Sequence, residues 1–310
     1  MKIAFFEIKP EEKIFFEKHL IQHEVFFFQG TINDMLQEAC NYDAVSVFVH
    51  SCITDEILER LPALKYLQTR STGYDHIKCD ALYYRGLVVS NVAGYGGPAV
   101  AEFAFSLLLN ATRHTHTALQ RSKKRDFEYA DLKGIELFDK TLGILGLGTI
   151  GSQMARIGKG FGMKILAYSR TRKPIIDELG IDFCDLDMVL RKSDILMLAL
   201  PLTPVTNALI NEKNAKLLNE DAIVVNTARG EIIEDVLYGK MKNILCLDVI
   251  SDVKYIHRDN ILYTPHMAFY TKEALERIMQ ISLVNMQAFL EEKPLPNCLK
   301  LSCKRDYGLK

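Results

Sequence analysis

The amino-acid sequence has little net charge, no long apolar run and no early signal segment. Its 310 residues carry a net charge of −1, so the overall balance does not favour nucleic acid or an anionic membrane surface as a partner. No apolar run approaches the roughly 20 residues that cross a bilayer, and acidic residues occur too early in MKIAFFEIKPEEK for a signal peptide. These absences predict a protein with no membrane segment and no nucleic-acid partner.

The cysteines lack the spacing of a disulfide framework or of a structural zinc site. They are odd in number, and no two of them form a Cys-x-x-Cys pair. They are scattered along the chain at Cys40, Cys52, Cys79, Cys184, Cys246, Cys298 and Cys303. Such usage is typical of a reducing compartment, and we therefore expect a cytoplasmic protein with no bound metal.

The composition is that of an ordinary globular protein, and the chain is long enough for two domains. In its first third, apolar runs rich in Val, Ile, Phe and Tyr predict five buried strands, at Lys2–Glu7, Val25–Gln29, Ala44–His50, Leu64–Ser71 and Leu87–Val92. Helical stretches are expected between them, at Glu11–Ile21, Ile32–Cys40, Asp55–Leu61 and Asp80–Arg85. Strands that alternate with helical crossovers predict a parallel, doubly wound sheet.

A second alternating set predicts a second parallel sheet. A long helical segment from Pro98 to about Ser122 precedes it, and the polar stretch SKKRDFEYADLKG that follows is interpreted as a solvated connection. The strands are expected at Thr141–Leu147, Lys164–Tyr168, Ile181–Cys184, Ile195–Leu200, Ile223–Asn226, Ile244–Leu247 and Ile261–Tyr263. The last helix, about Lys272 to Glu292, is expected to return to the first domain. The sequence thus predicts a discontinuous domain of residues 1–97 and 273–310, and a second domain of residues 98–272.

The strongest local motif is KTLGILGLGTIGSQMARIGKGFG, in which Gly146, Gly148 and Gly151 form G-x-G-x-x-G between an apolar strand and a helix. The first glycine permits the tight turn, the second lets a pyrophosphate approach the backbone, and the third lets the helix pack against the strand. Glycines in such a turn can also serve only to relieve crowding. The strand–turn–helix setting favours dinucleotide binding, and so a Rossmann domain at residues 98–272.

The end of the next strand, KILAYSRTRKP, bears on the choice of cofactor. An Asp or Glu commonly binds the ribose 2′-hydroxyl of NAD at this position, whereas this chain has Ser169 and Arg170, followed by Arg172 and Lys173. A hydroxyl and nearby guanidinium groups would accept a 2′-phosphate. The sequence favours NADP over NAD, although these cations could instead be exposed loop residues.

Several separated motifs make nearly the whole chain resemble the D-isomer-specific 2-hydroxyacid dehydrogenase family, most closely its D-lactate dehydrogenase branch. Besides the glycine motif they are RSTGYDHI, NVAGYGGPAVAE, LPLTPVT, NTARGE, LDV and TPH, in that order. The resemblance implies a flavodoxin-like substrate domain beside the Rossmann domain. It also implies an NAD(P)-dependent oxidoreductase for a small 2-oxoacid and its D-2-hydroxyacid, such as pyruvate, glyoxylate or hydroxypyruvate, and a homodimer.

The resemblance also implies roles for individual residues. Arg229 looks like the arginine that binds the substrate carboxylate and polarises its carbonyl, although a capping or surface arginine is the alternative. Thr72 and Gly73 look like backbone donors to that carboxylate. Tyr95 occupies the position of a substrate-contacting tyrosine; the alternative is an aromatic residue packed at the hinge between the domains. His266 looks like the general acid that protonates the carbonyl oxygen. His76 looks like a residue that supports the substrate-contacting residues without touching the substrate.

The cofactor positions implied by the resemblance lie along the second domain. They are Gly146, Gly148, Thr149, Ile150 and Gly151 at the pyrophosphate, Ser169 and Arg170 at the ribose, Leu200, Pro201 and Thr206 near the adenosine, and Thr227, Ala228, Arg229, Asp248 and His266 near the nicotinamide.

One position departs from the family pattern. A glutamate usually stands five residues after the LDV aspartate and binds the histidine, but this chain has Val253 there. Asp252 can replace it only if the loop changes register. The sequence favours retained catalysis, because Arg229 and His266 are both present. The alternative is a catalytically weakened homologue that binds the nucleotide and acts as a redox-sensing binding protein.

Overall fold

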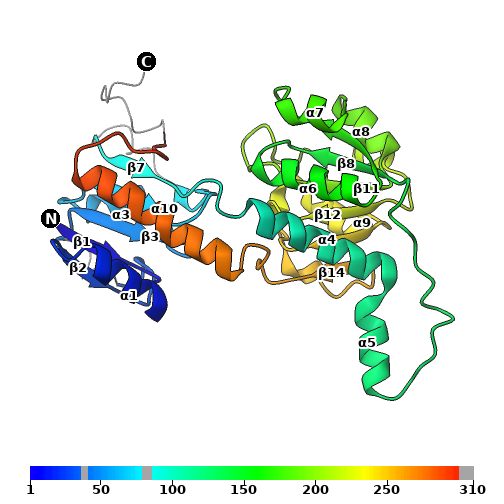
Figure 1. The fold of residues 1–310 in the computed structure, drawn as a ribbon, viewed down its shortest axis with the longest axis horizontal. Coiled ribbons are helices and arrows are strands. Elements are labelled where there is room, and N and C mark those ends of the chain that lie inside the picture. The colour runs from blue at the N-terminus through cyan, green and yellow to red at the C-terminus, as the bar shows by residue number, and fades with distance from the viewer. Residues whose placement is uncertain (36–40, 79–85, 300–310) are drawn as a thin grey trace. The chain divides into compact units, whose positions relative to one another are not determined.

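The computed structural model describes residues 1–35, 41–78 and 86–299, and the chain forms two compact units. The first unit is Met1–Tyr95 with Thr271–Lys310, and the second is Gly96–Tyr270. Each contains a parallel sheet with helices on its faces (Figure 1). The predicted fold class, two doubly wound α/β domains, is therefore confirmed. The helix expected at Asp80–Arg85 and the second half of that at Ile32–Cys40 lie outside the described residues.

The sheet of the first unit has the strand order β2-β1-β3-β5-β7, all parallel, which is the flavodoxin-like order. Its strands are β1 (Lys2–Phe5), β2 (Glu24–Phe27), β3 (Ala44–Val47), β5 (Tyr66–Thr69) and β7 (Val88–Ser90). β3 and β5 are buried along their whole length, because helices cover both faces of the sheet. A separate pair of two-residue strands, β4 (Ile53–Thr54) and β6 (Ile77–Lys78), is too short for sequence periodicity to reveal.

The helices of the first unit are α1 (Pro10–His19), α3 (Asp55–Glu59) and α10 (Lys272–Leu290). α1 and α10 pack on one face of the sheet, where Phe16 and Met286 meet Phe5, and α3 packs on the other. α10 comes from the far end of the sequence. The stacking of Phe289 on Tyr66, with ring centroids 4.4 Å apart, fastens it to β5. This packing makes the first unit discontinuous in sequence.

The sheet of the second unit has the order β10-β9-β8-β11-β12-β13-β14, again all parallel. Its strands are β8 (Thr141–Leu145), β9 (Lys164–Tyr168), β10 (Asp182–Phe183), β11 (Ile195–Leu198), β12 (Ile223–Asn226), β13 (Ile244–Leu247) and β14 (Ile261–Tyr263). The first six strands follow the Rossmann order 3-2-1-4-5-6, and β14 extends the sheet. The strand order reverses beside β8, where such folds bind dinucleotides.

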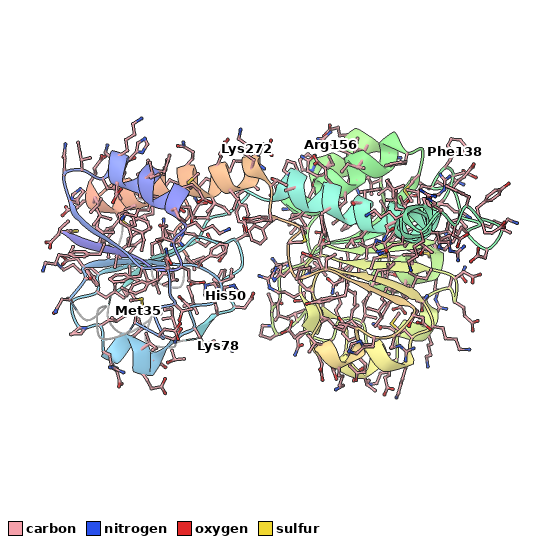
Figure 2. All side chains as sticks on the ribbon, turned by 90° about the horizontal axis from the view of Figure 1, so that it is seen from below. Met35, His50, Lys78, Phe138, Arg156 and Lys272 are labelled. Carbon is pink, nitrogen blue, oxygen red and sulfur yellow. The ribbon has the colours of Figure 1, made fainter. Side chains whose placement is uncertain are left out.

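The helices of the second unit are α4 (Gly97–Arg113), α5 (Thr115–Lys123), α6 (Thr149–Gly160), α7 (Pro174–Leu179), α8 (Leu186–Lys192) and α9 (Asp235–Lys240), with short 3₁₀ turns η2 (Ala215–Leu217), η3 (Gly230–Ile232) and η4 (Val253–Tyr255). Arg156 of α6 is labelled in Figure 2. It forms an ion pair with Glu178 of α7 at 2.7 Å, which connects the two helices at the surface.

The single helix expected from Pro98 to about Ser122 is in fact two helices. His114 adopts a left-handed φ of 49°, which ends α4 and starts α5 in a new direction. α5 and the polar stretch after it extend away from the rest of the unit (Figure 1). That stretch is folded back by the Arg121–Asp131 ion pair, at 2.6 Å. The expected solvated connection is thus an exposed, internally braced arm.

Within the described ranges, no helix has the length and apolar character needed to span a membrane. Cys52, Cys184 and Cys246 are free thiols, but Cys298 is disulfide-bonded. The scattered spacing of the cysteines, which argues against a disulfide framework, does not reveal this bond.

Candidate active site

The glycine-rich turn joins β8 to α6, and two of its glycines are required by the protein itself. Gly146 has a left-handed φ of 101°, and a Cβ there would lie 2.5 Å from the carbonyl oxygen of Ala199. A Cβ on Gly151 would lie 1.8 Å from the carbonyl oxygen of Gly146. The helix can approach the strand only because both positions lack a side chain.

Gly148 differs from its neighbours, because no described atom lies within 4 Å of a Cβ built there. Its φ of −78° is open to any residue, so neither crowding nor backbone conformation explains a glycine. A ligand that passes close to the backbone does explain it. α6 begins at Thr149 and continues through Ile150, so its first N–H groups are available to an anion. This arrangement fits the pyrophosphate of a dinucleotide.

Arg229 follows β12 on a turn that the Asn226 side chain holds in shape. Asn226 Oδ1 accepts from the Ala228 amide at 3.0 Å, and its Nδ2 donates to the Arg229 carbonyl at 2.8 Å. The Arg229 guanidinium donates to the Ala228 carbonyl at 2.7 Å. The buried Tyr238 hydroxyl supports the next residue by donating to the Gly230 carbonyl at 2.8 Å. The turn that presents the arginine is therefore fixed by the protein.

Thr227 contributes a buried hydroxyl to the same turn. The residue is only 8% exposed, and within the described chain its Oγ1 has no hydrogen-bond partner. Leaving a buried hydroxyl unpaired costs about 1–3 kcal/mol. Such a group fits a site in which a polar ligand atom completes the hydrogen bonding, as expected for a position near the nicotinamide.

His266 lies on a strained turn after β14. Its φ of 52° is in the left-handed region, which residues other than glycine rarely adopt. Its amide donates to the Asp248 carbonyl at 3.0 Å, and the ring of Phe269 lies edge-on to its own, with centroids 6.4 Å apart. A strained residue of this kind persists only where its surroundings hold it in place.

The carboxylate of Asp248 supplies that restraint. Asp248 is fully buried, and its Oδ1 accepts from the Thr264 hydroxyl at 2.7 Å and the Met267 amide at 2.9 Å. Its Oδ2 accepts from the Ala268 amide at 2.8 Å. These charge-assisted bonds hold the main chain on both sides of His266. The family resemblance associates Asp248 with the cofactor alone and does not reveal this task.

Arg229, Asp248 and His266 follow three adjacent parallel strands, β12, β13 and β14. Because carboxyl ends of parallel strands meet at one edge of a sheet, the three residues share that edge with the glycine-rich turn after β8. Leu200, which follows β11, packs beside that turn, since a Cβ on Gly146 would lie 2.9 Å from Leu200 Cδ2.

Two other groups of expected cofactor residues flank this edge. Thr206 Oγ1 donates to the Pro201 carbonyl at 2.6 Å, which closes the turn after Leu200. Ser169 is half-buried directly after β9, and Arg170 is exposed. Arg172 forms an ion pair with Asp177 of α7, whereas Arg170 forms no ion pair with any described residue. Of these two arginines, only Arg172 is engaged in an ion pair with a described residue.

Asp252, in the loop after Asp248, pairs with a lysine of the same loop. The Asp252 carboxylate accepts from the Lys254 amide at 2.9 Å and pairs with Lys254 Nζ at 2.5 Å. The hydrogen bond from the lysine side chain, together with that from its amide, lowers the pKa of Asp252. Val253, at the family's glutamate position, is 61% exposed. The role of Asp252 as a partner of His266 stays a prediction.

In the first unit, Thr72 and Gly73 lie on an exposed loop whose carbonyl groups are anchored. The Ser71 carbonyl accepts from the Val92 amide at 2.9 Å, and the Thr72 carbonyl accepts from Asn91 Nδ2 at 2.8 Å. Among the described residues, the amides of Thr72 and Gly73 have no acceptor. Two free N–H groups on an anchored loop fit a carboxylate.

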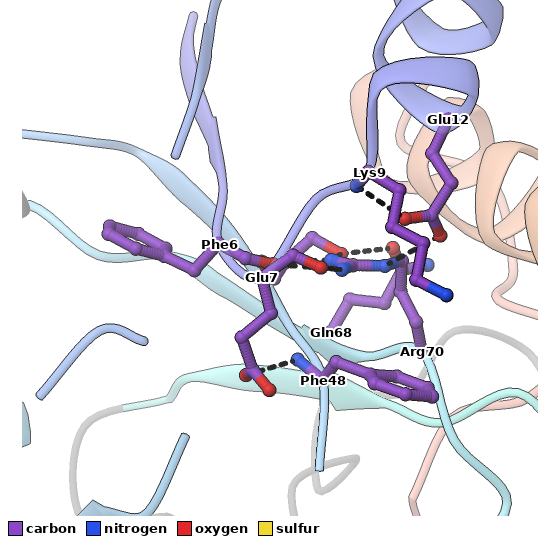
Figure 3. Close-up of polar contacts among 8 residues, drawn as sticks. Phe6, Glu7, Lys9, Glu12, Phe48, Gln68 and Arg70 are labelled. Atoms are coloured by element: carbon purple, nitrogen blue, oxygen red, sulfur yellow. Dashed lines mark hydrogen bonds and ion pairs between the residues drawn. The ribbon is translucent and has the colours of Figure 1, made fainter. Parts of the chain in front are cut away.

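Arg70 fastens the start of this loop to the sheet (Figure 3). It is 1% exposed, and its guanidinium donates to the carbonyls of Phe6 at 2.8 Å and Glu7 at 3.0 Å. The Phe48 ring lies 5.8 Å from its guanidinium carbon, and Glu12 Oε1 lies 3.8 Å from its Nε. Burial lowers the pKa of Arg70, and the Glu12 charge opposes that shift. Arg70 thus joins the ends of β1 and β5.

Tyr95 is buried, with 8% of its surface exposed, and its carbonyl accepts from Arg277 Nε at 2.7 Å. Arg70 and Asn91 were missed by sequence reasoning as supports of the loop, although both stand in quoted motifs. A polar residue directly after a buried strand is the signal that could have identified them.

Comparison with known proteins identifies the family. Residues 105–268 match the model of the D-isomer specific 2-hydroxyacid dehydrogenase, NAD binding domain. The chain belongs to this family. It is therefore an NAD(P)-dependent oxidoreductase of 2-hydroxyacids, as the motifs implied.

Individual relatives are similar over nearly the whole chain. The D-lactate dehydrogenase of Escherichia coli is 30% identical, with 96% of this chain and 99% of that protein covered. A glyoxylate reductase of Thermococcus litoralis is 35% identical, with 85% of each covered. The structure of Aquifex aeolicus D-lactate dehydrogenase, complexed with NAD and lactic acid, is similar with a TM-score of 0.87 at 30% identity, over 94% of this chain and 96% of that one.

Proposed function

We propose that this enzyme reduces a small 2-oxoacid of the pyruvate, glyoxylate or hydroxypyruvate type to the D-2-hydroxyacid. The observation that carries the proposal is the shared edge of β12, β13 and β14, which presents Arg229 and a strained, braced His266 beside the glycine-rich turn. The names of the similar proteins, D-lactate dehydrogenase and glyoxylate reductase, support the substrate class.

In the proposed reaction, each residue has a task that suits its chemistry. The free amides of Thr72 and Gly73 bind the substrate carboxylate, together with the planar guanidinium of Arg229. Arg229 also stabilises the negative charge that develops on the carbonyl oxygen. The bound nicotinamide cofactor supplies the hydride to the carbonyl carbon. Protonated His266 gives its proton to the oxygen and becomes neutral, which completes the alcohol.

For the cofactor we propose a preference for NADP. The proposal is supported by the residues directly after β9, Ser169 and the exposed Arg170, which offer a hydroxyl and a guanidinium group where relatives that bind NAD commonly have an acidic side chain. Replacement of Arg170 by alanine is expected to raise the KM for NADPH and leave that for NADH nearly unchanged. An unchanged ratio of the two values would reject the preference.

The main experiment is a steady-state assay of the three 2-oxoacids with NADPH and with NADH. We expect turnover of at least one acid, a strong loss of kcat in His266→Gln, and a raised KM for the acid in Arg229→Lys, whose ammonium cannot reproduce the planar fork. Cofactor binding without turnover of any acid would contradict the proposal and favour the redox-sensing binding protein.

We further propose that the protein is a homodimer that uses its exposed arm. On α5 and the stretch after it, Leu119, Phe127 and Tyr129 are 60%, 75% and 80% exposed. Apolar side chains gathered on a projecting segment suit a protein partner, and a second copy of the chain is the occupant that the family resemblance implies. Light scattering should give twice the chain mass, and Phe127→Ser with Tyr129→Ser should reduce it. A wild-type monomer would refute this.

A further inference from the structure

A chain of hydroxyl groups lies behind the loop of Thr72 and Gly73. Ser71 Oγ donates to the carbonyl of Gly73 at 2.6 Å. Thr69 Oγ1 lies 2.7 Å from Ser71 Oγ, and His76 Nε2 lies 2.9 Å from Thr69 Oγ1. Thr69 and Ser71 are almost completely buried, with exposures of 0% and 3%. The two hydroxyl groups between the histidine ring and the loop are therefore shielded from water.

The Gly73 carbonyl at one end of this series determines which atom donates in each of its hydrogen bonds. A carbonyl oxygen can only accept, so the single proton of Ser71 Oγ is used on Gly73. The bond between Thr69 and Ser71 must then use the proton of Thr69. Thr69 Oγ1 has no proton left for His76, so His76 Nε2 must carry the hydrogen and donate it. Only a histidine with an Nε2–H group satisfies the arrangement.

We propose that His76 is a positioning residue for substrate binding, which orders the carboxylate-binding loop through Thr69 and Ser71. This inference rests on the proposed role of Thr72 and Gly73. His76 touches neither substrate nor cofactor in this scheme. His76 donates the first of three successive hydrogen bonds, and the Gly73 carbonyl accepts the last one.

The Gly73 carbonyl is the place where the loop needs such a restraint. The two preceding carbonyls, of Ser71 and Thr72, are held by Val92 and Asn91. In a trans peptide the N–H points opposite to the C=O, so these bonds aim the amides of Thr72 and Gly73. Glycine has the widest conformational freedom of all residues, so the peptide after Gly73 is the one that could turn without external support.

The kinetic test compares two replacements of His76. His76→Leu keeps the volume but removes the donor, whereas His76→Gln keeps an N–H near the Nε2 position. We expect His76→Leu to raise the KM for the 2-oxoacid about five- to tenfold, the factor that loss of one hydrogen bond produces. Its kcat and its KM for the cofactor should change little, since carboxylate binding is the same in ground and transition states. His76→Gln should restore a KM near that of the wild type.

Thr69→Val interrupts the same series of hydrogen bonds at its middle and should raise the KM as much as His76→Leu. The double variant should then be no worse than either single one, because both remove one pathway. His19→Leu, on the exposed end of α1, is the matched control and should change no kinetic constant. An unchanged KM in His76→Leu, equal defects in His76→Leu and His76→Gln, or additive effects in the double variant would overturn the inference.

A direct measurement on the wild-type protein complements the kinetics. Nitrogen-15 NMR of the wild-type protein reports which ring nitrogen of a neutral histidine carries the hydrogen, and His76→Gln identifies the signal. We expect Nε2–H, and an Nδ1–H tautomer would overturn the proposal. Failure of the proposed function is distinguishable, because the wild type would then reduce no 2-oxoacid, whatever its tautomer.

Discussion

Replacement of Asp248 by asparagine tests whether a buried carboxylate holds the candidate catalytic histidine in place. The two side chains have nearly the same shape, so the change leaves no cavity. It replaces one acceptor oxygen by an NH₂ group. If the amide oxygen keeps the bonds from the Thr264 hydroxyl and the Met267 amide, the NH₂ group faces the Ala268 amide, and two donors oppose each other.

The magnitude follows from the bonds that are weakened. Hydrogen bonds to a charged acceptor contribute about 1.5–3 kcal/mol each and neutral ones about 1, while an unpaired buried donor costs about 1–3 kcal/mol. The relief of burying a neutral group offsets part of this loss. We therefore expect the free energy of unfolding to fall by about 2–4 kcal/mol. The left-handed φ of His266 destabilises the turn by about 1–2 kcal/mol. The loss of hydrogen-bond free energy in Asp248→Asn is at least as large as this strain, so we expect the turn to change its conformation.

The assay combines urea denaturation with steady-state kinetics. Asp248→Asn should lower the urea midpoint and reduce kcat at least about tenfold, because a proton donor displaced by an ångström loses much of its effect. Asp187→Asn, an exposed aspartate of the same unit, is the control and should change neither quantity. If Asp248→Asn retained both the wild-type midpoint and the wild-type kcat, the carboxylate would not be what holds the turn, and the reasoning would be refuted.

Two further predictions concern the cofactor turn and the loop after Asp248. Gly148→Ala should leave the urea midpoint unchanged, since its Cβ meets no described atom, yet weaken cofactor binding more than about tenfold, whereas Gly151→Ala should lower the midpoint by clashing with the Gly146 carbonyl. Equal effects of both on stability would contradict this. Asp252 has a pKa lowered by Lys254, so any stability it contributes is present above its unfolded pKa of about 4 and is lost only as pH falls through the lower folded value. Asp252→Asn should therefore leave an inflection of kcat/KM between about pH 5 and 8 in place, because that range belongs to a histidine such as His266; a displaced inflection would make Asp252 its partner.

Sequence periodicity could predict the two sheets because their central strands are buried on both faces and read as continuous apolar runs. It could not predict the break at His114, since the residues on both sides of it have helical spacing. His114 adopts its left-handed conformation because the chain changes direction into the arm, and local helix propensity does not indicate this. The strands β4 and β6 were missed because each is two residues long and lies in no longer apolar stretch, unlike β10, which falls within Ile181–Cys184.

The candidate site divides in the same way. The motifs could predict a candidate ligand-facing edge, because they have glycines and single polar residues directly after strands. The bonds that support them join distant segments, such as Asp248 with Ala268 or Asn91 with Thr72, and no spacing within one motif reveals them. The glycine motif is the exception, because it assigns a different role to each glycine. The structure agrees with those roles, since a Cβ would meet backbone atoms at Gly146 and Gly151 and open space at Gly148.

The absence of the family's glutamate at Val253 changes what must orient His266, but it does not leave the residue without orientation. The backbone of His266 is fixed from Asp248 through its own amide and through those of Met267 and Ala268. The Phe269 ring stands edge-on to the imidazole. A glutamate does two things in the family pattern: it orients the ring, and it raises its pKa. The first can be met by this bracing, whereas the second needs a charge near the ring. The bracing therefore predicts that turnover is retained although Val253 replaces the family's glutamate, and a wild-type protein that binds the cofactor but reduces no 2-oxoacid would contradict this.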